Sequence, residues 1–407
     1  MRAGLGLLLA VVLAAGVPSR SAGAQTATVT REQAVRQVLA QRVDALQRGD
    51  RAAFLDTVDP SAGDEFKTRQ GRLFDGLRSL PLASYDLRLR TDEVPDLAGG
   101  GLAGRYPADG VFLPPVEAHY RLTGIDTIDA VDGYYYTFLL RGGRWRIVSD
   151  RDVEDVGLPS ARNLWDYGPV SQERTAHFTV LHDPADRKRA EALAALCEEA
   201  YAKLTATFGR AVPTQIVVVL PHNLDQLREI LQATFDLSNF VAFASSSVDR
   251  DDDWQSTAPR VYVQDANLSR SRRDFQLQTF HHEFTHVAAF PLAGPFVPSW
   301  IHEGLADWMA GGQRGPTPVE GTDGLLPDDW EFTAGGGDSI LRAYDESTSA
   351  MAFLAAHKGK TAPLDLLVRV GADRVAPGTS HYRVDQALRA IYGAGMDQFQ
   401  KDWNGGR

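Results

Sequence analysis

The sequence predicts an α+β protein with two domains. The chain has 407 residues and is 43% apolar, which is enough material for two ordinary cores. Its first half opens with a helical pattern and continues with alternating strands. Its second half mixes strands with helices and ends in helical patterns. Between the halves the periodicity fades over 156–175, where glycine and proline recur, and we expect a linker there.

The first residues have the order of a secretory signal. Arg2 is followed by an apolar run from Leu5 to Val17 and then by Ala22-Gly23-Ala24. We expect residues 1–24 to be removed from a protein that is secreted or otherwise extracytoplasmic in a bacterial cell. The run is short for a membrane span, so no stable membrane insertion is expected after cleavage. An uncleaved membrane anchor is the alternative interpretation.

The N-terminal domain, 25–155, is predicted to be a helix followed by antiparallel strands. Thr30 stands three residues before Gln33 in a capping-box pattern, and apolar residues then recur at helical spacing up to Gly49. Later stretches alternate apolar and polar residues, and Gly142-Gly143 is a hairpin signal. These stretches are 84–90, 116–125 and 134–150.

This order of elements resembles the nuclear transport factor 2-like superfamily. The resemblance covers roughly Thr30 to Asp150, with "ALQRGDRAAFLDTVDP" near its beginning and "RWRIVSD" at its end. It implies an α+β cone that serves as an accessory domain. Pockets of such cones sometimes bind ligands or other domains, and the resemblance implies nothing more about activity.

The second domain, 176–407, is predicted to contain a small sheet with crossing helices. Expected strands are 177–183, 214–221 and 260–265, and expected helices are 185–208 and 224–233. From about Tyr344 onward the apolar pattern is helical. The remaining long stretch, 316–339, is either a lid over a cleft or a solvated crossing.

Composition excludes some classes of function. The formal charge of −11 disfavours polyanionic partners, so we expect no nucleic-acid binding. Cys197 is the only cysteine, which rules out an intramolecular disulfide. Because Cys197 lies among apolar residues at helical spacing, we expect a buried structural thiol rather than a catalytic one.

The segment "HEFTH", 282–286, carries the pattern H-E-x-x-H. On a helix, for which Ser271 is a candidate cap, His282 and His286 lie about 6 Å apart along the axis on one face, so both rings can reach one ion. Glu283 lies about a third of a turn away, where it can hydrogen-bond a water on that ion. Zinc suits such a set, which requires a third protein ligand. A buried helix with hydrogen-bonded histidines is the structural alternative.

A second segment, "VPSWIHEGLADW", supplies the missing carboxylate. Glu303 follows a plausible helix start at Pro298 and Ser299. Asp307 lies four residues further on the same face, well spaced to accept a hydrogen bond from the other ring nitrogen of a ligand histidine, His282 above all. His281 and His302 point away from the ligand face and are expected to pack or to hydrogen-bond.

The paired motifs resemble the gluzincin metallopeptidases, and specifically the peptidase MA-like group. The second pattern of that group, P-x-W-[L/I]-x-E-G-x-A, is matched here by 298–306, and the resemblance covers about His177 to Trp403. It implies a zincin-type domain with one zinc per chain, His282, His286 and Glu303 as its ligands, and Glu283 as general base.

The resemblance also implies how a substrate is handled. Tyr344 resembles a tyrosine near the metal site whose phenol faces the oxyanion, although a packed tyrosine is equally consistent with the sequence. His381 and Tyr382 are a fallback pair for that role. In related peptidases an extended peptide adds to a sheet edge, for which 241–247 and 260–265 are the candidates.

These observations together predict an exported zinc-dependent peptidase. In this hypothesis the metal activates a water, Glu283 acts as general base, and the partner is a peptide or protein substrate. Two alternatives stay open: a zinc hydrolase that acts on something other than peptides, and a binding or scaffold protein with a vestigial zinc site. The sequence indicates no oligomeric state and no cleavage specificity.

Overall fold

The computed structural model describes residues 30–405 apart from 92–101, 234–235, 239, 253, 318, 320–323, 333–336 and 373–379. The expected signal segment, 1–24, lies outside the described residues, as does part of the expected lid or crossing, 316–339. Helices combine with antiparallel and mixed sheets, which confirms the predicted α+β class. Within the described residues, no helix has the length and apolar character needed to cross a membrane.

The N-terminal half contains helices and two antiparallel sheets, with strand orders β1-β3-β4 and β2-β5-β6. Its helices are α1 (Arg31–Arg48), α2 (Arg51–Asp56), α3 (Asp64–Ser79) and α4 (Leu102–Arg105). Its strands are β1 (Leu82–Leu89), β2 (Gly110–Phe112), β3 (Pro115–Leu122), β4 (Ala130–Tyr135), β5 (Thr137–Arg141) and β6 (Arg144–Ser149). The predicted helix and strands are therefore all present.

Local sequence signals set the ends of these elements. Thr30 caps α1, and the reciprocal bonds between Thr30 and Gln33 form the expected capping box. The helix ends at Gly49, which has the left-handed φ of 72°. Gly142 and Gly143 both have positive φ, as the tight turn between β5 and β6 requires.

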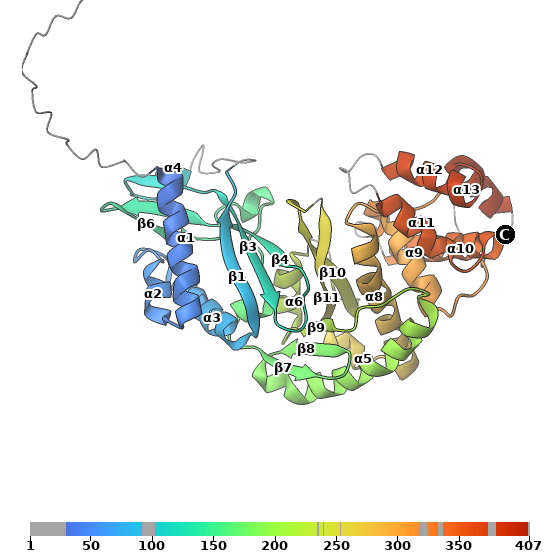
Figure 1. Cartoon of the computed structure of the whole chain (residues 1–407), viewed down its shortest axis with the longest axis horizontal. Coiled ribbons are helices and arrows are strands. Elements are labelled where there is room, and N and C mark those ends of the chain that lie inside the picture. The colour runs from blue at the N-terminus through green and yellow to red at the C-terminus, as the bar shows by residue number, and fades with distance from the viewer. Residues whose placement is uncertain are drawn as a thin grey trace, which may run out of the picture.

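The C-terminal half is built on a five-stranded sheet of order β10-β11-β9-β8-β7. The three inner strands run parallel, whereas β10 and β7 are antiparallel to their neighbours. The strands are β7 (Ser171–Arg174), β8 (Phe178–His182), β9 (Ile216–Leu220), β10 (Ala242–Asp249) and β11 (Gln255–Val263). In this order β10 forms one edge of the sheet and lies beside α8 (Arg273–Ala293) (Figure 1).

The two faces of this sheet are covered by different parts of the chain. Helices α5 (Arg187–Thr207) and α8 pack on one face, where Val218 and Val261 are buried. The N-terminal half packs on the other face, where Val217 and Val219 join a cluster with residues of α1, α3, β3 and β4. The two halves therefore share a core, and in Figure 1 the strands β9 to β11 lie between them.

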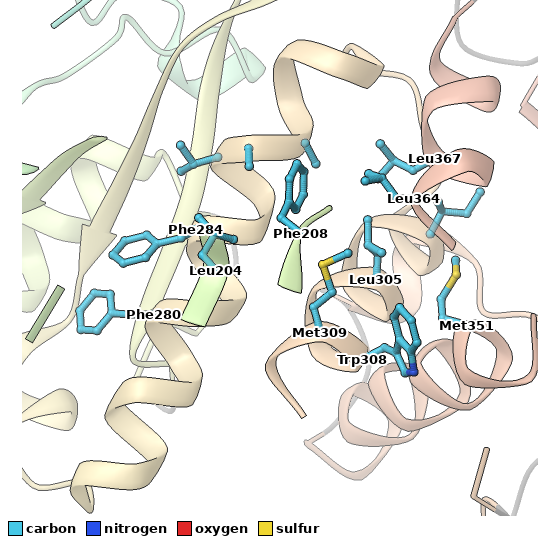
Figure 2. Packing of buried hydrophobic residues seen from close by; sticks show 14 of the residues in the cluster. Leu204, Phe208, Phe280, Phe284, Leu305, Trp308, Met309, Met351, Leu364 and Leu367 are labelled. Atoms are coloured by element: carbon cyan, nitrogen blue, oxygen red, sulfur yellow. The ribbon is translucent and has the colours of Figure 1, made fainter. Parts of the chain in front are cut away.

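The rest of the second half is helical, as predicted. Figure 2 shows the packing of α9 against its neighbours, with Leu305 and Trp308 directed into a cluster that includes Met351 and Leu367. The helices are α6 (Leu224–Leu231), α7 (Asp265–Leu268), α9 (Ser299–Ala310), α10 (Gly337–Lys358), α11 (Ala362–Gly371), α12 (Ser380–Ile391) and α13 (Met396–Gly405). Cys197 is buried in α5, which fits a structural thiol.

The segment 156–175, which we expected to be a linker, is more ordered than its composition indicates. It includes the short helix η3 (Leu164–Asp166) and strand β7, which pairs with β8. Trp165 packs edge-on against Tyr120 of the N-terminal half at a ring distance of 5.4 Å. This segment therefore binds the two halves to each other instead of separating them.

Candidate metal centre

Helix α8 carries the first motif. Its apolar side chains Phe280, Phe284 and Val287 are fully buried, and Phe284 contacts Phe178 of β8 at a ring distance of 4.8 Å. This packing fixes the rotation of the helix about its axis. Ser271 does not cap α8, because Arg272 holds the cap position and the Ser271 hydroxyl donates to the carbonyl of Asn267 at 2.9 Å.

Three potential ligand atoms converge between α8 and α9. The Nε2 atoms of His282 and His286 are 3.0 Å apart, and they lie 3.2 and 3.3 Å from Oε2 of Glu303. Zinc ligands at about 2.0 to 2.1 Å in a tetrahedron lie about 3.3 to 3.4 Å from one another. The three atoms match that spacing to within a few tenths of an ångström, so the residues fit a zinc ion.

Asp307 sets the orientation of the first histidine. Its Oδ1 accepts a hydrogen bond of 2.6 Å from Nδ1 of His282, which leaves Nε2 facing the other two ligands. This hydrogen bond is the one that the sequence predicted between Asp307 and a ligand histidine. Because α9 presents Glu303 and Asp307 one turn apart on the same face, a single helix supplies both a ligand and the group that orients another ligand.

The ionisable groups at the centre shift one another's pKa values strongly. Burial alone would lower the pKa of His282, but Asp307 and Glu303 outweigh it and raise that pKa well above its ordinary value. Burial alone would raise the pKa of Glu303, but His286 and His282 outweigh it and hold that pKa well below its usual range. Two imidazoles and a carboxylate this close are stable only when protons or a metal ion lie among them.

Glu283 lies beside this centre and is buried. Burial raises the pKa of its carboxyl, and His282 and His286 only partly oppose that rise. The carboxyl also hydrogen-bonds the backbone of Ala244 in β10, so the expected base lies between the metal centre and the sheet edge. A carboxylate with a raised pKa is better matched to proton transfer near neutral pH than an exposed one.

A cleft of about 340 Å³ opens over the centre. Its walls come from β10, from α8, from α9 and from Tyr344 of α10. Of the two strands considered as a peptide-binding edge, β11 is internal to the sheet and β10 is at the edge in the described part of the chain. Sequence could not decide between them, because strand order depends on contacts between distant segments.

The other candidate residues differ in position. Tyr344 hydrogen-bonds Glu303, and burial together with Glu303, Asp307 and Glu283 raises its pKa well above the ordinary value, so it remains a protonated donor. His381 and Tyr382 are not at this centre, since His381 lines another cavity and Tyr382 is 69% exposed.

His281 and His302 fit the packing role that we expected. His281 shares a 2.8 Å hydrogen bond with Thr207, and burial lowers its pKa to about 4. Burial also lowers the pKa of His302 to about 4, and its ring lies 6.0 Å from that of His286. Neither ring belongs to the convergent set of ligand atoms.

The sequence named 241–247 as a candidate sheet edge but did not indicate which of its residues face the cleft. Ser245 and Ser246 of β10 line it, which depends on the pairing of β10 with β11 and not on the local pattern. Comparison of the chain with protein-family models gives no match, and comparison with curated proteins gives none either.

Proposed function

We propose that the protein is an exported zinc-dependent peptidase in which His282, His286 and Glu303 hold one zinc ion. The observation that carries this proposal is the convergence of three ligand atoms at tetrahedral spacing, with the buried carboxyl of Glu283 beside them and a sheet edge across the cleft. The gluzincin-like motifs and the signal-like first residues are in keeping with it.

The proton chemistry belongs to Glu283. When bound, zinc polarises the scissile carbonyl and acidifies water at the site. In the proposed reaction Glu283 accepts a proton from the attacking water and returns it to the leaving amine. Glu283 belongs to α8 and is buried beside Ala244 of β10 in the wall of the cleft, and its role in both proton transfers is part of the proposal.

Two further side chains support this reaction. Asp307 holds the ring of His282 in the orientation that ligation needs, through the 2.6 Å bond to Nδ1. Tyr344 keeps its proton and lines the cleft, so its hydroxyl is a donor for the oxyanion that forms on the carbonyl. In the structure that hydroxyl donates to Glu303, and we propose that it turns to the substrate during the reaction.

Strand β10 is the proposed platform for the peptide. An edge strand offers unpaired backbone groups to which an extended peptide can add by main-chain hydrogen bonds. Ala244 and Ser245 lie beside Glu283 in the wall of the cleft. A peptide along this edge brings its backbone carbonyl near the metal ligands.

The test is cleavage of a peptide library by the purified mature chain. We expect cleavage that a chelator abolishes and that added zinc restores, with one zinc per chain by elemental analysis. Cleavage that survives full removal of the metal would contradict the proposal. Full zinc occupancy without peptide cleavage would favour one of the alternatives, and hydrolysis of non-peptide esters or amides would then separate a hydrolase from a scaffold.

A further inference from the structure

A second cavity, of about 420 Å³, lies between the two halves of the protein. Its walls come from β4 of the N-terminal half, from residues 159–163, from the end of α6, and from β10 and β11. It thus lies on the side of the sheet that the N-terminal half covers. None of these residues belongs to the metal centre.

This cavity meets the metal cleft at the sheet edge. Ser245, Ser246 and Val248 of β10 line both of them.

The register of β10 with β11 explains how one strand serves both sides. Ala244 pairs with Val261, which packs toward α8, whereas Ser245 pairs with Arg260. A peptide added to β10 alternates its side chains between the two faces of the sheet. Side chains at alternate positions therefore point toward the second cavity.

Charge balance indicates which side chain fits there. Both arginines in the wall already have carboxylate partners: Arg260 lies 2.7 Å from Asp126, and Arg162 lies 3.2 Å from Asp150. Asp132 of β4 is the acidic residue of the wall, and its hydrogen bonds come from neutral donors. These are the side-chain amide of Asn163, at 2.7 Å, and the side chain of Tyr120.

The negative charge of an ionised Asp132 carboxylate is only partly stabilised by its surroundings. Burial raises the pKa of its carboxyl, and Asn163, Tyr120 and the nearby Arg260 only partly oppose that rise. Part of the residue nevertheless remains accessible from the cavity. Among the described residues no ion pair to Asp132 is formed, so a cationic group that enters the cavity would provide a directly paired charge, whereas an anionic group would be repelled by the carboxylate.

We propose that this cavity is a subsite for a basic side chain, lysine or arginine, of the peptide that lies along β10, with Asp132 as its counter-ion. The proposal rests on the peptidase function proposed above. It gives the N-terminal half a role in substrate selection, because that half supplies Asp132 and much of the wall.

The experiment measures peptide binding and does not depend on turnover. Zinc-loaded Glu283→Gln protein is titrated with short alanine-based peptides that carry one lysine at successive positions, and with matched peptides that carry norleucine or glutamate there. Fluorescence anisotropy gives each Kd. We expect lysine at one position to bind about 10- to 100-fold more tightly than norleucine, as for a buried charge-assisted hydrogen bond.

Adding Asp132→Asn should bring the ratio of the two Kd values close to one. The matched control is Asp129→Asn, next to the same strand, because Asp129 is paired with Arg121 at 2.7 Å and does not line the cavity. That control should keep the full ratio. A lysine preference that persists in Asp132→Asn, a preference for glutamate, equal binding of all peptides, or no binding at all would each overturn the proposal.

A second variant covers the case in which Asp132→Asn does not fold. Ser247 lines the same cavity but not the metal cleft, so Ser247→Lys places a competing cation in the wall of this cavity. It should also remove the lysine preference, and a preference that survives it counts against the subsite.

Hydrolysis by the wild-type chain is measured separately. Peptide cleavage without the lysine preference would refute the subsite alone.

Discussion

Glu283 is the residue on which the proposed hydrolysis depends most directly. Replacing it with glutamine keeps the size of the side chain but removes the proton acceptor. We expect Glu283→Gln to lower kcat by about 100- to 10,000-fold, the usual contribution of a general base, while the zinc content stays at one per chain. Single-turnover peptide cleavage and elemental analysis check both parts.

The matched control is Glu199→Gln, an exposed glutamate of α5 that forms an ion pair with Arg273. It should leave both values unchanged. If Glu283→Gln retained the wild-type rate, another group would have to accept the proton, and the assignment of Glu283 would be wrong.

Single residues of the centre were predictable where their geometry is local. The i, i+4 spacing of His282 and His286, and that of Glu303 and Asp307, follows from helix geometry alone. Their convergence was expected because a zinc site requires a third ligand and because the paired motifs resemble a known family, but it depends on the packing of α8 against α9, which spacing along the chain does not fix. The acidic wall residue Asp132 was not predicted, because it reaches its cavity through the packing of two halves that are far apart in sequence.

At the scale of elements, the metal centre depends on close packing between α9 and α10. A Cβ at Gly304 would lie 2.5 Å from the carbonyl oxygen of Ser347, so the two helices could not approach as they do. We expect Gly304→Ala to lower the free energy of unfolding by about 1 to 3 kcal/mol and to weaken zinc binding, because Glu303 is displaced with α9. Chemical denaturation and a competitive zinc titration measure the two effects.

Gly337→Ala is the control for this element, because a Cβ at the start of α10 meets nothing within 4 Å. It should change neither stability by more than a fraction of a kcal/mol nor zinc affinity. Equal behaviour of the two variants would show that the contact at Gly304 does not position the ligand.

The short helix η3 contributes a pH dependence of stability. Burial raises the pKa of Asp166 from 3.8 to about 7, against the opposing effect of Arg162. Between these values the native protein holds a proton that the unfolded chain has lost, so this residue's contribution to stability is present at low pH and is lost as the pH rises through 7.

Asp166→Asn should remove that loss. We expect the stability of the variant relative to wild type to increase by on the order of 2 kcal/mol between pH 5 and pH 8, measured by urea denaturation. Asp225→Asn, at an exposed position of α6, is the control and should show no such trend. A constant difference between Asp166→Asn and wild type across this range would contradict the assignment.

Elements with regular periodicity were predicted well. The capping box at Thr30 and the hairpin glycines 142 and 143 identify their elements without any tertiary contact. Strand order and the structure of 156–175 were not predictable. Strand β7 is polar and forms only because β8 offers it an edge, and η3 is fixed by contacts with the N-terminal half.

At the scale of the whole molecule, the two halves share a core, from which we expect them to unfold as one unit. The face of the sheet that carries Leu181, Val217 and Val219 is buried by the N-terminal half. We expect the full chain to unfold in a single calorimetric transition, and the isolated fragment 176–407 to aggregate or to melt at least about 10 °C lower, because that face is exposed. A chain that begins at residue 25 should melt like the full protein.

Two separate transitions in the full chain, or a fragment 176–407 as stable as the whole, would show that the halves are independent. The sequence predicted two domains from the fading periodicity between them. That signal reports local structure and contains no information on the apolar surface that the halves share.

The position of β10 at the end of the strand order, in the part of the chain that the structure describes, has a consequence for solubility. An unpaired edge that accepts a peptide is also a template on which copies of the same chain can stack. The pairing of β10 with β11 is irregular between Ser245 and Ser247, and such bulges twist a strand so that long, flat ladders cannot form along it. The same kink should confine any guest chain to a few residues beside the metal ligands and should disfavour fibril-like growth of the protein on itself.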